Sequence, residues 1–99
     1  MNDGDVFTSG PPKPRILLVE DEATLREYLA RTLSGDYVVD TASDGRQALM
    51  QVAQACLELV MTDIVMPELD GIELLPALRS VPRTQMIPVL LISGRAIDE

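Results

Sequence analysis

Short hydrophobic runs alternate with amphipathic stretches from residue 15 onward. Residues 16–19, 59–62 and 87–92 are dominated by apolar side chains, which is typical of strands buried on both faces. Residues 37–41 are more polar, so we expect them to form a strand at the edge of a sheet. Pro88 stands near the start of the last run, where a missing N–H group does least harm. The pattern therefore predicts four strands.

Between these runs, apolar residues recur at helical spacing three times. We expect helices that begin near Glu22, Asp44 and Asp70, the two aspartates acting as N-terminal caps. Their predicted inner stripes are Leu25, Tyr28, Leu29, Thr32 and Leu33 in the first, Ala48, Leu49, Val52 and Cys56 in the second, and Ile72, Leu75 and Leu78 in the third. The second stripe predicts that Cys56 is buried.

The predicted elements follow one another as βαβαβαβ. Strands buried on both faces and separated by helices predict an α/β fold, namely a doubly wound parallel sheet with right-handed crossovers and helices on both faces. Residues 1–14 lack this pattern and end with prolines at positions 11, 12 and 14. We therefore expect a flexible leader over 1–14 and one domain over 15–99.

Composition narrows the functional classes. The 99 residues include 16 acidic and 8 basic side chains, for a net charge of −8, which disfavours direct contact with nucleic acid. One cysteine excludes an internal disulfide, and without histidine no Cys/His zinc site can form. No window approaches the roughly 18 apolar residues of a membrane span, and no signal peptide is expected. We therefore expect a cytoplasmic protein that contacts neither membranes nor nucleic acid.

Acidic side chains and one hydroxyl stand where the predicted strands end. Glu20 and Asp21 follow the first strand, Asp63 follows the third, and Ser93 follows the fourth. In doubly wound sheets, ligands bind outside these carboxyl ends. If the first and third strands are neighbours, three carboxylates converge and favour a cation, and ligands that are all oxygen suit Mg²⁺. The alternative, that acidic residues end strands because they are hydrated, suits one such residue better than three convergent ones.

Three segments together resemble the receiver domains of two-component response regulators. They are Val19-Glu20-Asp21, then Thr62-Asp63-Ile64-Val65-Met66-Pro67-Glu68-Leu69-Asp70-Gly71, and finally Leu90-Leu91-Ile92-Ser93-Gly94. They come in the family's order, each at the end of a predicted strand, and the resemblance extends over about residues 15–99. It implies a five-stranded, flavodoxin-like fold and a phosphoryl group transferred to an aspartate from a histidine kinase or phosphotransfer protein.

The resemblance also implies a role for each matching residue. Asp63 matches the phosphoacceptor. Together with Asp63, Asp21 would hold Mg²⁺ directly, Glu20 through water, and Val65 through its backbone carbonyl. Ser93 matches the residue whose hydroxyl bonds the phosphoryl group and moves on activation. A carboxylate is a weak nucleophile toward an anionic phosphoryl group, and a divalent metal offsets their repulsion. We expect a signalling module and not an enzyme.

The sequence departs from the family after the fourth predicted strand. The family continues there with a helix, a fifth strand ending in a lysine, and a closing helix. This sequence stops at Glu99, and its one lysine is Lys13. We therefore expect an incomplete receiver, either truncated or a natural remnant. Its exposed fourth-strand edge would pair with another chain, as in a homodimer, or with a further segment.

Functions from other classes compete with phosphoacceptance. The missing lysine favours a degenerate receiver that acts only in protein interaction or dimerisation. An aspartate-nucleophile phosphatase usually carries a second acid two residues after the nucleophile, where this chain has Val65. A flavin-binding relative of the fold is disfavoured, because Glu20 and Asp21 would repel a phosphate placed after the first strand.

Overall fold

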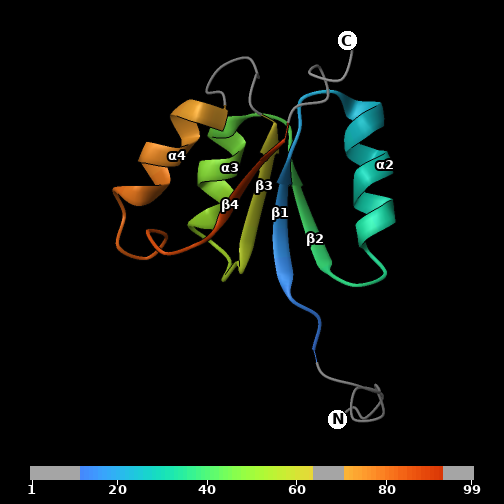
Figure 1. Ribbon diagram of the computed structural model, residues 1–99, viewed down its shortest axis with the longest axis horizontal. Coiled ribbons are helices and arrows are strands. Elements are labelled where there is room, and N and C mark those ends of the chain that lie inside the picture. Colours follow the sequence, from blue (N-terminus) through green and yellow to red (C-terminus); the bar gives the residue numbers. More distant parts are fainter. Residues whose placement is uncertain (1–11, 64–70, 93–99) are drawn as a thin grey trace.

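The chain forms one parallel sheet with helices on both sides (Figure 1). A computed structural model describes residues 12–63 and 71–92. The elements are β1 (Arg15–Val19), α2 (Ala23–Leu33), β2 (Val38–Ala42), α3 (Gly45–Val52), β3 (Leu59–Asp63), α4 (Gly71–Arg79) and β4 (Val89–Ile92). The strand order is β2-β1-β3-β4, and all pairings are parallel. This confirms the predicted doubly wound α/β fold, and the more polar β2 lies at an edge as expected.

Acidic side chains begin two of the helices. A Glu22 carboxylate oxygen accepts from the Leu25 N–H of α2 at 2.7 Å, and an Asp44 oxygen accepts from the Gln47 N–H of α3 at 2.9 Å. Each bond satisfies one of the backbone donors that a helix leaves unpaired at its start. The predicted cap at Asp44 is confirmed. Asp70, the predicted cap of α4, lies outside the described residues.

One face of the sheet is closed by α3 and α4. In its core, side chains that alternate along the strands pack against the inner sides of both helices. The members of this core are Leu17, Val19, Ala42, Ala48, Val52, Leu57, Val60, Leu74 and Leu78, none of them more than 8% exposed. Figure 1 shows α3 and α4 together on the side of the sheet opposite α2. This face supplies most of the hydrophobic burial in the described chain.

The expectation that Cys56 is buried is wrong. α3 ends at Val52, and the Gln54 N–H closes a turn on the Gln51 carbonyl at 3.0 Å, so the helical stripe does not reach residue 56. Cys56 is exposed, and Leu57, at 8% exposure, enters the core in its place. Apolar periodicity continues in the sequence past Val52, where the backbone leaves the helix.

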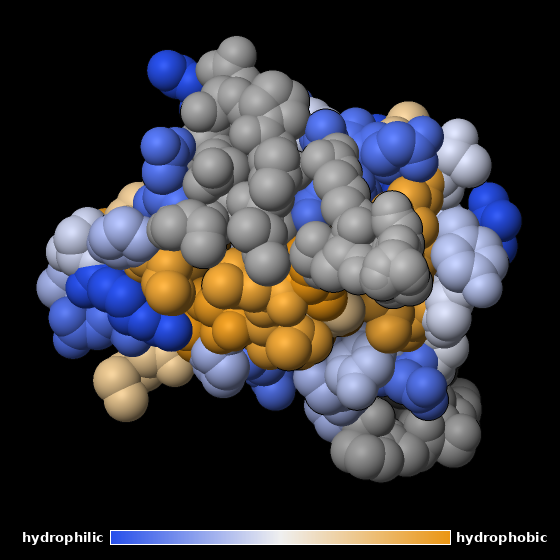
Figure 2. All heavy atoms as spheres, turned by 45° about the horizontal axis from the view of Figure 1, so that its top comes forward, coloured by the Kyte–Doolittle hydropathy of each residue, from blue (hydrophilic) through white to orange (hydrophobic). Residues whose placement is uncertain are grey.

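The other face of the sheet is covered less completely. α2 contacts β1 and β2, yet none of its residues is fully buried. Leu18, Met61 and Leu90 follow one another in register across β1, β3 and β4. Their exposure rises from 0% at Leu18 to 49% at Leu90. Figure 2 shows a hydrophobic patch on the surface between α2 and α4. Among the described helices, none is long and apolar enough to cross a membrane.

Candidate functional site

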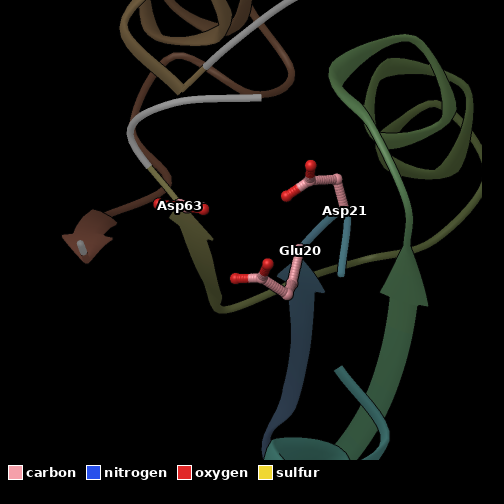
Figure 3. Close-up of side chains that lie close together, drawn as sticks. All are labelled: Glu20, Asp21 and Asp63. Carbon is pink, nitrogen blue, oxygen red and sulfur yellow. The ribbon is translucent and has the colours of Figure 1, made fainter. Parts of the chain in front are cut away.

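Three acidic side chains meet at the carboxyl edge of the sheet. β1 and β3 are adjacent, with Val19 beside Thr62, so the residues that end these strands come to the same place. Carboxylate oxygens of Glu20, Asp21 and Asp63 all lie within 4.8 Å of one another. Figure 3 shows Glu20 and Asp21 extending from the end of β1 toward Asp63 on β3. The structure thus contains the convergence of carboxylates that the strand order predicts.

Hydrogen bonds fix the loop that carries two of these acids. The Glu20 N–H donates to the Ala42 carbonyl of β2 at 3.0 Å, and the Glu22 N–H donates to Glu20 Oε2 at 3.0 Å. From the first turns of α2, Arg26 Nη1 donates to the Glu20 carbonyl at 2.9 Å and to the Asp21 carbonyl at 3.5 Å. The loop after β1 is therefore attached to both β2 and α2.

The site is shielded from solvent and carries unsatisfied acceptors. Glu20 is 3% exposed and Asp63 is 5% exposed. Asp21 Oδ1 and Asp63 Oδ1 are buried and have no hydrogen-bond partner among the described residues. Burial, reinforced by the charges of Asp63 and Asp21, raises the pKa of Glu20 above its usual range, although the bond from the Glu22 N–H opposes this shift. Holding these acids together without a positive partner costs free energy.

The donor set fits a hard divalent cation. Its ligand atoms are all carboxylate oxygens, and the two buried Oδ1 atoms are acceptors that a cation would satisfy. Ca²⁺ takes 6–8 oxygen ligands, whereas Mg²⁺ is usually bound by one or two carboxylates, several waters and a phosphate oxygen. Three carboxylates at a strand edge match the smaller requirement. Asp21 and Asp63 would supply direct ligands, and Glu20 would add negative charge beside them.

Two predicted site residues are not placed by the structure. Val65 and Ser93 lie outside the described residues. Of the predicted set, the structure therefore brings together Glu20, Asp21 and Asp63, and it locates them by the pairing of β1 with β3.

Arg26 is a site residue that sequence reasoning missed. A positive side chain near the start of a helix opposes the helix dipole, so Arg26, the fourth residue of α2, is unexpected at that position. This conflict is a signal that could have identified it. The structure resolves the conflict, because the guanidinium turns back to the carbonyls of Glu20 and Asp21.

Fold and site together define a class of protein, namely doubly wound parallel α/β domains with an acidic pocket at the carboxyl edge of the sheet. The sequence profile of the response regulator receiver domain matches residues 16–99. The chain belongs to the response regulator receiver family.

Individual relatives carry similar sequences and folds. The chain is 42% identical over 82 residues to the response regulator MprA of Mycolicibacterium vanbaalenii, which covers 82% of this chain and 35% of that protein. It is 36% identical over 84 residues to the hybrid signal transduction histidine kinase D of Dictyostelium discoideum, covering 85% of this chain and 5% of the kinase. The chain thus spans about a third of the first relative's length and a small part of the second.

Solved structures agree with the fold. A sensor protein from Polaromonas sp. JS666 superposes with a TM-score of 0.80 at 34% identity, covering 86% of this chain and 69% of that one. The chemotaxis response regulator CheY4 of Vibrio cholerae gives a TM-score of 0.76 at 31% identity, covering 80% of this chain and 67% of the other. The fold is that of CheY-like receiver domains.

Proposed function

We propose that this chain is the phosphoacceptor module of a two-component system and that Asp63 receives the phosphoryl group. The observation that carries the proposal is the buried Oδ1 of Asp63, which lies beside Glu20 and Asp21 and has no hydrogen-bond partner among the described residues. Membership of the receiver family and similarity to a hybrid histidine kinase support a histidine kinase or phosphotransfer protein as the donor. The proposed location is the cytoplasm, and the net charge of −8 disfavours a direct nucleic-acid partner.

The proposed reaction transfers a phosphoryl group from a nitrogen atom of a phosphohistidine to a carboxylate oxygen of Asp63. An Asp63 carboxylate oxygen attacks the phosphorus of a phosphohistidine, the P–N bond breaks, and the leaving imidazole takes up a proton. The product is an acyl phosphate on Asp63. Mg²⁺, when bound, supplies positive charge that offsets the repulsion between the carboxylate and the phosphoryl oxygens. Asp21 and Asp63 would be its direct ligands.

The remaining residues complete this proposal by their position in the motifs. Glu20 would hold a water of the metal, and Val65 would contribute its backbone carbonyl. The Ser93 hydroxyl would donate to a phosphoryl oxygen and follow it, which would couple phosphorylation to a change of shape. The proposed module catalyses no reaction on another substrate.

A second candidate function is protein interaction through the edge of the sheet. β4 is an edge strand of the described sheet, and its Leu90 is 49% exposed. An apolar edge with unpaired backbone groups is a template for a strand of another chain. We propose a homodimer through β4 as the form this interaction takes, either beside phosphoacceptance or, in a degenerate receiver, in its place.

Phosphorylation of the whole chain tests the first proposal. The chain is incubated with phosphoramidate and Mg²⁺, and the modified residue is mapped by mass spectrometry. We expect labelling at Asp63 that is lost in Asp63→Asn and without Mg²⁺. Asp36→Asn is the matched control, because Asp36 is an exposed acid away from the site, and it should be labelled like the wild type. Full labelling of Asp63→Asn would overturn the assignment.

A further inference from the structure

Arg26 occupies a position that helix electrostatics disfavours. It is the fourth residue of α2, and its side chain turns toward the helix start, where the dipole is positive. Its hydrogen-bond partners among the described residues are two backbone carbonyls, those of Glu20 and Asp21. A carbonyl is neutral, so neither of these hydrogen bonds pairs the guanidinium with a formal counter-ion. Ordinary surface pairing therefore does not explain this geometry.

The two carbonyls belong to the residues whose carboxylates form the acidic cluster. A peptide carbonyl and the side chain of the same residue share one Cα atom, so fixing the carbonyl restricts the direction of the side chain. Arg26 holds two successive carbonyls with one nitrogen, Nη1. The other side of the loop is fixed by the Glu20 N–H on Ala42 of β2. Arg26 thus restrains the segment that aims two carboxylates at Asp63 (Figure 3).

Charge and geometry predict opposite effects for this side chain. As a positive charge near the cluster, Arg26 should repel a divalent cation, so its removal should strengthen metal binding. As a restraint on the loop, it holds the ligands in position before the cation arrives, so its removal should weaken binding. Groups that orient metal ligands commonly change metal affinity about 10–100-fold when they are lost. The sign of the change therefore identifies the role.

We propose that Arg26 is a positioning residue for the divalent-cation site and that its restraint on Glu20 and Asp21 outweighs its repulsion of the cation. This inference rests on the proposed function, because it takes the acidic cluster to be a Mg²⁺ site. Arg26 acts through the backbone of the acidic loop and does not contact the cation or the reacting atoms.

Titration with Mg²⁺ alone, without a phosphodonor, tests the proposal on the whole chain. Binding is followed by NMR shifts of the Asp21 and Asp63 amides in the wild type, Arg26→Met and Arg26→Lys. Methionine removes the charge and the donors, whereas lysine keeps a charge and a donor on a long stem. Arg31→Met is the matched control, because Arg31 is an exposed residue of the same helix. Urea unfolding of each variant, without metal, establishes that it is folded.

The expected result is that Arg26→Met binds Mg²⁺ about tenfold more weakly than the wild type, that Arg26→Lys recovers much of this loss, and that Arg31→Met binds as tightly as the wild type or slightly more tightly. Unchanged or tighter binding by folded Arg26→Met would overturn the positioning role and leave the Mg²⁺ site intact. If Arg26→Met does not fold, weaker binding by Arg26→Lys than by Arg31→Met supports the role, and equal binding overturns it. Absence of Mg²⁺ binding to the wild type would overturn the proposed function, and this inference with it.

Discussion

The two faces of the sheet differ in how completely they are covered. On the side of α3 and α4, Leu17 and Val60 from the strands and Leu74 from α4 have no exposed surface. On the side of α2, Tyr28 is 60% exposed and Leu90 is 49% exposed. Both faces present apolar side chains, so hydrophobicity alone does not account for the difference. The described helices close one face and leave part of the other available for contact.

The face that stabilises the domain thus differs from the face that leaves apolar side chains exposed. The closed face holds the core that fixes the relative positions of β1 and β3, and hence of the three acids at their ends. The face on the side of α2, the open face, contributes less burial and presents the apolar patch of Figure 2. Contiguous apolar patches on a protein surface are candidate contact sites.

The stability of the chain should depend most on the closed face. Leu74→Ala removes a side chain with no exposed surface from the contact between α4 and the sheet. Loss of transfer free energy and formation of a cavity should lower the free energy of unfolding by about 2–5 kcal/mol. Urea unfolding followed by circular dichroism measures the change. A loss below about 1 kcal/mol would show that the closed face is not the main source of stability.

The second prediction concerns Glu20, at the carboxyl edge of the sheet, and how the free energy of unfolding depends on pH. Burial raises the pKa of Glu20 above its ordinary value of 4.5. Between that value and the raised one, the folded chain holds a proton that the unfolded chain has released, so stability contributed by the neutral form falls as pH rises. Glu20→Gln should remove this fall. In metal-free buffer, the stability of this variant relative to that of the wild type should therefore increase from pH 4 to pH 7.

The measurement for Glu20 is a pair of urea unfolding curves at each pH, with a chelator present. The comparison isolates the contribution of the cluster that contains Glu20, because the two chains differ only at that residue. Asp36→Asn serves as a control, because it removes an exposed acid that lies outside the cluster. A difference between Glu20→Gln and the wild type that is the same at pH 4 and pH 7 would contradict the prediction. We expect an effect smaller than that of Leu74→Ala.

Much of the fold and of the acidic cluster could be predicted from the sequence. Continuous apolar runs predicted the strands, and the acids after them predicted the cluster, because parallel strands end at one edge of the sheet. The burial of Cys56 was predicted wrongly, since periodicity does not report where α3 ends. Arg26 was missed because its partners are backbone carbonyls, whose positions depend on how the loop folds. Residue patterns thus predict which side chains converge more reliably than which backbone groups hold them there.

The smallest effect on stability is expected on the open face, at Leu90. The side chain is 49% exposed and lies on β4, an edge strand of the described sheet. Replacing it by lysine should change the free energy of unfolding by only about 0.5 kcal/mol, as is usual for surface positions.

The same change places a charge where a second chain would add a strand, and charged residues are a common means of blocking such pairing. If the proposed homodimer forms through β4, sedimentation should show concentration-dependent association of the wild type that is weakened in Leu90→Lys. Val38→Lys is a matched control, because Val38 is 40% exposed at the start of the opposite edge strand, β2. Equal association of the two lysine variants would exclude β4 as the specific interface, and a wild type that is monomeric at every concentration would exclude the homodimer.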